Sequence, residues 1–146
     1  MSDVAYITTI EQVIAIHSKT VEHSGGGDHG QLELGKLESV LQHIQNDDYY
    51  PSFADKLTHL FFSTCQFHCF TDGNKRLAIT LSTYFLIING YMAIAKDFMA
   101  ITENISYYVA AGRISKALLH RIMEAIMNGT YQDDETLKLE ILSAIQ

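Results

Sequence analysis

Proline and tryptophan are the scarcest residues in this chain of 146 amino acids: Pro51 is its only proline, and tryptophan is absent. With one proline to interrupt helices, and with apolar residues at 47% of the composition, the sequence predicts a soluble, mainly helical protein rather than a disordered one. The length is sufficient for one hydrophobic core and is too short for two domains that each bury a core of their own. We therefore expect a single all-α domain over residues 1–146.

Positive charge is also scarce. Lys and Arg together number 10 against 17 Asp and Glu, which gives a net charge of −7, and Lys75-Arg76 is the only basic cluster. A chain without a larger basic cluster lacks the electrostatic footprint of a nucleic-acid binder. We therefore expect no nucleic acid among its partners, whereas a basic protein partner is compatible with this charge.

Cysteine is limited to Cys65 and Cys69, and two cysteines alone form neither a disulfide framework nor a zinc ligand set. We expect them to be small apolar residues of a reduced core. The N-terminus has no charged and apolar leader, and Thr80, Ser82 and Thr83 interrupt the longest apolar run. These absences predict a cytoplasmic protein that does not enter a membrane.

Helical periodicity is present along most of the chain. Helices are expected over residues 10–23, 34–44, 54–67, 77–88, 98–111, 116–128 and 134–145, with a connector over 91–96. The run over 77–88 is apolar on nearly every face, which predicts a buried central helix. Thr8 and Thr9 lie three residues before Glu11 and Gln12, a capping-box pattern, and Ser115 is expected to cap the helix that follows it.

The segment from His68 to Arg76 joins two of these helices and reads His-Cys-Phe-Thr-Asp-Gly-Asn-Lys-Arg. His68 is a titratable imidazole whose ordinary pKa suits general-base work near neutral pH. Asp72 is a hard oxygen ligand of the kind that Mg²⁺ prefers. Together they predict activation of a hydroxyl beside a metal-bound nucleotide.

The next four residues of the segment suit an anion. Gly73 lets the backbone approach a ligand closely, and Asn74 stabilises the turn or donates to an oxyanion. Lys75 and Arg76 offer donors to phosphate oxygens at a helix start whose backbone N–H groups lack intrahelical partners. Taken singly, these residues also fit an ordinary turn and a solvated helix end. Their combination predicts a phosphate cradle.

The pattern His-x-Phe-x-Asp-Gly-Asn-Lys-Arg resembles the signature of the Fic/Doc family, and the lysine after the asparagine makes it similar to the Doc, or death-on-curing, branch. Similarities in residues 25–41, at Tyr50-Pro51 and at Asn89-Gly90 extend the resemblance over about residues 5–128. Residues 130–146 then form an extra C-terminal helix. The resemblance implies a helical bundle around the buried central helix.

The resemblance also implies roles for single residues. It implies that His68 deprotonates a Ser or Thr hydroxyl on a target protein and that Asp72 holds Mg²⁺ bound to ATP. It further implies a phosphate cradle made of Gly73, Asn74, Lys75 and Arg76.

A further implication is a flap, a short extended hairpin beside the active site that docks the target chain by strand addition. We expect this flap near residues 46–52, with Tyr49 and Tyr50 as its docking residues. An acidic loop with two half-buried tyrosines is the alternative for this segment.

Lys75 decides the type of reaction that the resemblance implies. Fic proteins that transfer AMP carry a second glycine there, which leaves room for the inner phosphates, whereas Doc carries a lysine and transfers the terminal phosphate of ATP to elongation factor Tu. We therefore expect an ATP- and Mg²⁺-dependent protein kinase, the toxin of a toxin–antitoxin pair that a small antitoxin protein silences. The alternatives are AMP transfer to a protein hydroxyl and a catalytically silent binding module.

Two departures from the family pattern bear on these alternatives. Ile79 replaces the second arginine of Fic enzymes, which weakens the case for AMP transfer. Residues 136–140 loosely fit the inhibitory Ser/Thr-x-x-x-Glu helix of some Fic proteins, although Ile141 stands where Gly or Asn is expected. Because Glu140 would need the missing arginine as its partner, self-inhibition is not expected.

Overall fold

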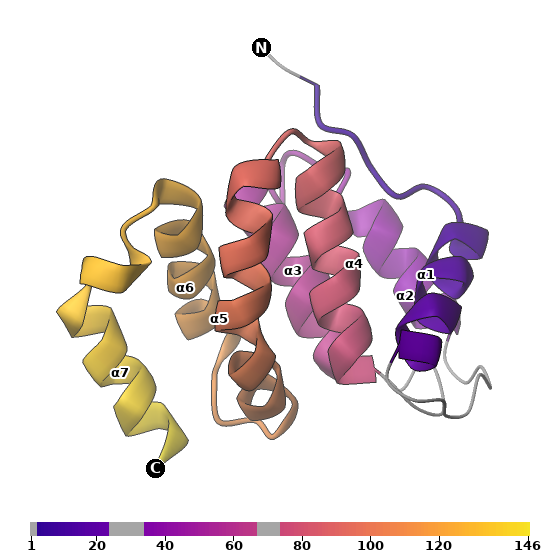
Figure 1. The fold of residues 1–146 in the computed structure, drawn as a ribbon. Helices are drawn as coiled ribbons and strands as arrows, with labels where there is room; N and C mark the ends of the chain where they lie inside the picture. The colour runs from indigo at the N-terminus through magenta and orange to yellow at the C-terminus, as the bar shows by residue number, and fades with distance from the viewer. Residues whose placement is uncertain (1–2, 24–33, 67–73) are drawn as a thin grey trace.

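The computed structural model describes residues 3–23, 34–66 and 74–146, and its regular secondary structure is entirely helical (Figure 1). These residues contain no strand, which confirms the all-α class. The elements are α1 (Ile10–His23), α2 (Leu34–His43), α3 (Phe53–Gln66), α4 (Asn74–Ile88), α5 (Met92–Ala110), α6 (Lys116–Asn128), the short 3₁₀-helix η1 (Tyr131–Asp133) and α7 (Glu135–Ile145).

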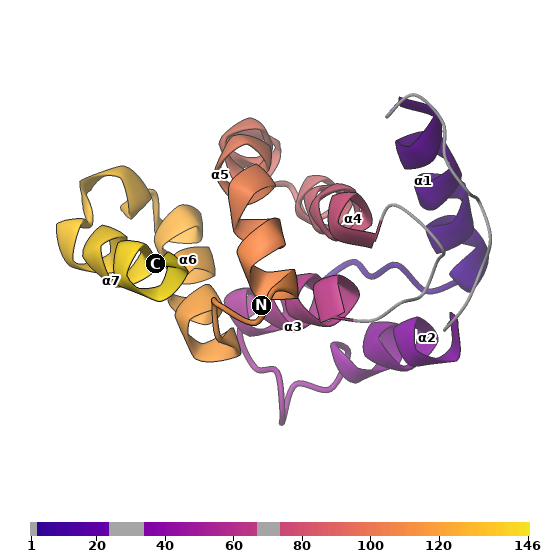
Figure 2. The ribbon, with the colours of Figure 1, turned by 90° about the horizontal axis from the view of Figure 1, so that it is seen from below.

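Helices α3, α4 and α5 form the centre of the molecule (Figures 1 and 2). Each packs against the other two. On one side α1 covers α4 and α2 covers α3, while on the other side α6 packs against α3 and α5. Helix α7 lies outermost and contacts α6.

Helix α4 is the buried central helix that the apolar pattern predicts. Leu77, Leu81 and Phe85 are completely inaccessible to solvent, and the polar Ser82 is buried as well. The residues of α4 that remain accessible to solvent lie on one edge of the helix, where Tyr84 is 38% exposed. The expected helix at 77–88 is thus confirmed, with one partly open edge.

Local signals set the ends of several helices. Thr9 Oγ1 accepts from the backbone N–H of Gln12 at 3.3 Å, and Gln12 Oε1 accepts from the N–H of Thr9 at 3.2 Å. This reciprocal pair confirms the capping box at the start of α1. Ser115 Oγ accepts from Leu118 N–H at 3.1 Å at the start of α6, and Gly129 ends that helix with a left-handed φ of 73°.

The connector expected at residues 91–96 is wrong, because α5 begins at Met92. Residues 92–97 contain neither proline nor glycine, and alanine is the best helix former, so nothing in this stretch opposes helix. Ala95 is also buried, and its packing adds to that propensity. The turn between α4 and α5 is consequently short and centred on Gly90, whose φ is 86°.

Lys56 is a buried cation at the point where three segments meet. It is 1% exposed, and its Nζ donates to the carbonyl of Ile44 at 2.7 Å and to Asp47 Oδ1 at 2.7 Å. The same Nζ lies 5.6 Å from the centre of the Tyr6 ring. A buried charge is tolerated only with such partners, so Lys56 ties the N-terminal segment and the end of α2 to α3.

Asn89 fixes the N-terminal segment to the end of α4. Its Oδ1 accepts from Ala5 N–H at 2.7 Å, while its Nδ2 donates to the carbonyls of Ala5 at 2.9 Å and Phe85 at 2.8 Å. The Tyr6 ring stacks on Phe85 with the ring centres 6.1 Å apart. The chain before α1 is therefore held by side-chain contacts rather than by a helix.

Candidate functional site

The phosphate cradle predicted from the sequence is described in part, at the first turn of α4. The helix begins at Asn74, and the exposed Lys75 and Arg76 follow in its first turn. The first backbone N–H groups of a helix have no intrahelical acceptors and carry the positive end of the helix dipole. With two cationic side chains beside them, these groups suit a phosphate of a nucleotide.

His68, Asp72 and Gly73 lie outside the described residues. Their predicted roles as general base, Mg²⁺ ligand and part of the cradle therefore stay predictions. Among the described residues, no group of three or more His, Cys, Asp and Glu side chains is placed to hold a metal ion.

Cys65 packs in the core at the C-terminal end of α3. It is a free thiol and 6% exposed. Burial raises the pKa of Cys65 to about 12, although the charge of Lys75 opposes this shift. Since the thiolate is the reactive form of cysteine, Cys65 is an inert apolar residue, as the sequence predicts. Cys69 lies outside the described residues.

A groove runs along the open edge of α4 from Arg76, between α1 and α5. Its cavity has a volume of about 570 Å³, and its lining is mostly apolar. Ile79, which stands where Fic enzymes carry their second arginine, is 9% exposed and belongs to this lining. The lining residues are Ile16 and Lys19 of α1, Arg76, Ile79, Thr80, Thr83, Tyr84 and Ile87 of α4, and Met99, Ala100 and Glu103 of α5.

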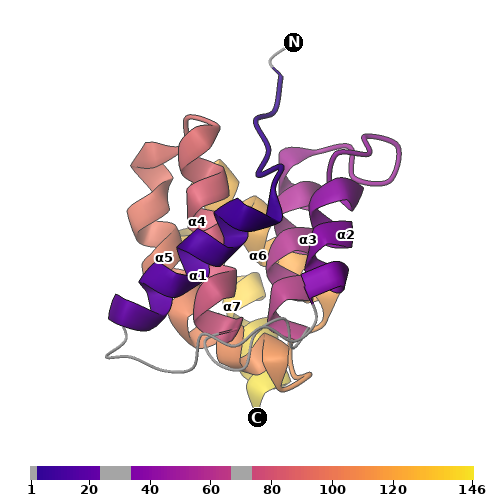
Figure 3. The same cartoon turned by 90° about the vertical axis from the view of Figure 1, so that its right-hand side faces the viewer.

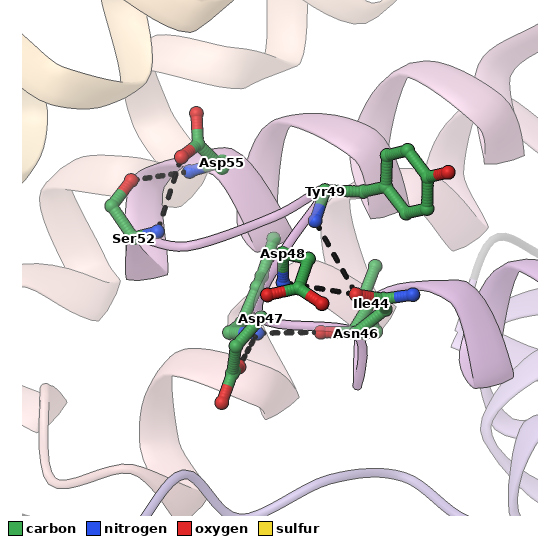
Figure 4. Close-up of polar contacts among 8 residues, drawn as sticks. Ile44, Asn46, Asp47, Asp48, Tyr49, Ser52 and Asp55 are labelled. Carbon is green, nitrogen blue, oxygen red and sulfur yellow. Dashed lines mark hydrogen bonds and ion pairs between the residues drawn. The ribbon is translucent and has the colours of Figure 1, made fainter.

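The extended hairpin expected at residues 46–52 is wrong, because this segment forms a hydrogen-bonded turn. Asn46 Oδ1 accepts from the backbone N–H groups of Asp48 at 2.9 Å and of Tyr49 at 3.3 Å, and the Asn46 carbonyl accepts from Tyr50 N–H at 2.9 Å. These bonds fold the backbone back on itself, so it offers no strand edge. Figure 4 shows the Tyr49 side chain pointing away from the turn, and its exposure is 78%.

This turn also lies far from the start of α4. It precedes α3, whereas the cradle follows α3, and the 14 residues of that helix span about 20 Å. Figure 3 shows the α2–α3 connection at one end of the helices and the start of α4 at the other. Tyr49 and Tyr50 are therefore not brought together with Lys75 and Arg76.

Tyr50 belongs instead to a polar cluster between α3 and α6 that the sequence did not reveal. Its ring stacks on His59 with the ring centres 4.5 Å apart, and the Nζ of Lys116 lies 2.8 Å from His59 Nδ1. Burial lowers the pKa of His59 to about 4, and the charges of Lys116 and His43 add to this effect. His59 is consequently neutral at physiological pH.

The C-terminal helix does not reach the cradle. Glu140, the residue that would act in an inhibitory helix, forms an ion pair with Arg121 of α6. Leu137 is buried against the bundle, while Leu139 is 65% exposed. The helix expected at 134–145 is confirmed at Glu135–Ile145, and its Glu140 is engaged away from the start of α4.

Comparison with known proteins agrees with the motif. The Fic/DOC family matches residues 6–86, which is more than half of the chain. The protein therefore belongs to the Fic/DOC family. Its relatives include the protein kinase doc of Escherichia phage P1, which is 28% identical over 109 residues, or 72% of this chain and 82% of that protein. The resemblance to the Doc branch is thus confirmed. No helix in the described part of the chain is long and apolar enough to cross a membrane.

Proposed function

We propose that this protein is a Doc-like kinase, which transfers the γ-phosphate of ATP to a Ser or Thr hydroxyl of a target protein with the help of Mg²⁺. The observation that carries this proposal is the exposed Lys75 in the first turn of α4, directly after the Asp-Gly-Asn sequence. A lysine in this position occupies the space that AMP-transferring Fic proteins leave open with glycine. The cradle then presents the outermost phosphate rather than an inner one.

Two further observations support phosphate transfer over AMP transfer. Ile79 lies on the groove edge of α4 one turn after Arg76, so the second arginine of Fic enzymes is missing from this helix. The phage P1 relative is named as a protein kinase. Both favour a site that acts on the end of the triphosphate.

In this proposal each residue of the motif has one task. His68 accepts the proton of the target hydroxyl, whose oxygen forms a bond to the γ-phosphorus while the bond to the leaving ADP oxygen breaks. Asp72 holds Mg²⁺, which neutralises phosphate charge when it is bound. The phosphate oxygens are held by donors of Gly73, Asn74, Lys75 and Arg76.

The proposed biological setting follows from the family. We propose a toxin of a toxin–antitoxin pair in the cytoplasm, with a translation factor such as elongation factor Tu as its target and a small antitoxin protein as its inhibitor. A small open reading frame beside the gene would encode the antitoxin. Co-expression of that frame should restore the growth that the wild-type protein suppresses, and His68→Ala should not suppress growth at all.

The decisive experiment uses ATP labelled at one phosphate at a time. Purified protein, Mg²⁺ and elongation factor Tu are incubated with γ-labelled or α-labelled ATP, and label on the target is measured. Transfer from γ-labelled ATP alone, lost in His68→Ala and retained in the control His43→Ala, is the expected result. His43 is a suitable control because it is an exposed histidine on α2.

Other outcomes contradict the proposal in distinct ways. Transfer of the α-label identifies an AMP transferase. Absence of both labels from elongation factor Tu and from every protein of a whole-cell extract identifies a silent binding module. Full transfer by His68→Ala overturns the mechanism itself.

A further inference from the structure

Lys116 is a half-buried lysine that has no carboxylate partner in the described part of the chain. It is the first residue of α6, and no described Asp or Glu oxygen lies within 4.0 Å of its Nζ. Asp55 of α3 and Glu124 of α6 contact His120 instead, at 2.7 and 3.4 Å. A half-buried ammonium without a counter-charge is costly, so this site favours the neutral amine.

The groups that face Lys116 carry no negative charge. Its Nζ lies 2.8 Å from His59 Nδ1, 5.6 Å from the centre of the Tyr50 ring and 6.0 Å from the centre of the Phe62 ring. His43 of α2 lies beyond His59, with the two ring centres 5.9 Å apart. The ring faces attract a cation, but burial outweighs this attraction and lowers the pKa of Lys116.

We propose that Lys116 is an acyl-acceptor site, at which a small acyl phosphate modifies the amine with His59 as the proton acceptor. The Nζ lone pair forms a bond to the carbonyl carbon, the bond from that carbon to the phosphate oxygen breaks, and phosphate leaves with the electron pair. The nitrogen proton passes to His59 Nδ1 and then to water. The product is a neutral amide, and no residue of the proposed kinase site takes part.

Exposure alone predicts the opposite order of reactivity. Lys96 is exposed on α5, whereas Lys116 is half-buried, so a reagent limited by access should modify Lys96 faster. An ordinary exposed lysine is a neutral amine in only about one molecule in 2,500 at pH 7. A reagent limited by the supply of neutral amine should therefore modify Lys116 faster.

The experiment compares these two lysines within the same molecule. The wild-type protein is incubated with acetyl phosphate at neutral pH, and mass spectrometry of its peptides gives the initial rate of acetylation at each lysine. We expect Lys116 to react about threefold or more faster than Lys96, as a desolvated amine should. In urea, where the chain is unfolded, the two rates should become equal. A rate at Lys116 equal to or below that at Lys96 in the folded protein overturns the proposal.

Two variants test the part played by His59. His59→Leu keeps an apolar side chain beside Lys116 but removes the proton acceptor, and we expect acetylation of Lys116 to fall toward the rate of Lys96. His120→Ala is the matched control, because it removes a different imidazole from the α3–α6 interface and should leave the rate at Lys116 unchanged. Circular dichroism checks that both variants are folded. An unchanged rate at Lys116 in His59→Leu overturns the role of His59.

A second readout needs no acyl donor. Acylation removes the charge of Lys116, which is one cause of the low pKa of His59. Lys116→Gln, a neutral mimic of the acylated side chain, should therefore raise the pKa of His59 in an NMR titration, whereas Lys96→Gln should not. The His59 signal is identified by its absence in His59→Leu. An unmoved pKa of His59 in Lys116→Gln would contradict the contact on which the site depends.

Discussion

Lys116 donates to His59 across the α3–α6 interface, with 2.8 Å between Nζ and Nδ1, and this contact requires that Nδ1 of His59 carry no proton. Because His59 also stacks on Tyr50, one neutral imidazole links the turn before α3 to the start of α6. Protonation of His59 would replace the hydrogen bond by repulsion between two cations.

The stability of the fold should therefore depend on pH through His59. Its pKa is about 4 in the folded protein and 6.5 in the unfolded chain, so between these values the unfolded chain binds a proton that the folded chain does not. This contribution to stability is complete above pH 6.5 and is lost as the pH falls toward 4. Allowing for solvent screening, we expect a loss of about 1–2 kcal/mol.

Urea unfolding at several pH values between 4 and 7 measures this effect. His59→Leu should flatten the slope of unfolding free energy over this range relative to the wild-type protein. Asp55, whose pKa is lowered because its hydrogen bonds from Ser52 and His120 outweigh burial, acts at lower pH and should not obscure the comparison. Parallel curves for the two proteins would show that His59 does not carry the dependence.

Loss of the buried cation should be costly. Lys56→Met leaves the carbonyl of Ile44 without its donor and Asp47 without its partner, and we expect about 2–4 kcal/mol of lost unfolding free energy. Denaturant unfolding with constant m-values measures the change. Lys96→Met, at an exposed position of α5, is the control and should stay within about 0.5 kcal/mol of the wild-type protein. A similar stability for both variants would refute the structural role of Lys56.

Removing Glu140 should not activate the enzyme. Its carboxylate is engaged by Arg121 of α6, so Glu140→Gln has no inhibitory contact at the cradle to release. We expect transfer of the γ-phosphate by this variant to remain within about twofold of the wild-type rate, because an exposed ion pair contributes little. A rise of tenfold or more in the same labelling assay would restore self-inhibition as an explanation.

Replacing Lys75 should alter which phosphate reacts. Lys75→Gly removes a cationic donor from the first turn of α4 and opens the space that AMP-transferring relatives keep free. We expect γ-phosphate transfer to fall by about 100- to 1,000-fold, the range for loss of one preorganised transition-state donor. Labelling with γ- and α-labelled ATP in parallel measures both activities. Unchanged γ-transfer in Lys75→Gly would remove the main support for the kinase assignment.

The helices were largely predictable because their signals are local. The capping pair of Thr9 and Gln12, the Ser115 cap and the glycine after α6 each act within one turn of the residues that they order. The start of α5 at Met92 is not predictable in this way, because no local capping signal marks it.

The same distinction between local and distant contacts applies to the candidate site. The cradle could be predicted because its proposed residues form one contiguous motif and are neighbours in the chain. The misplaced flap depended on distance in space, and the length of α3 separates Tyr49 from the start of α4. The bond between Lys116 and His59 joins residues 57 positions apart, and the bond between Gln66 and Val109 spans 43, so no sequence pattern announces either contact.

The hydrogen bonds between Asn89 and Ala5 affect the order in which the protein folds. Neighbouring helices such as α3, α4 and α5 follow one another in sequence, so their packing closes only short loops, and low contact order of this kind favours rapid folding. The hydrogen bonds between Ala5 and Asn89 close a loop of 84 residues, and they cannot stabilise the protein until α4 has formed. The irregular segment before α1 should accordingly dock last during refolding, after the helical hairpins have formed.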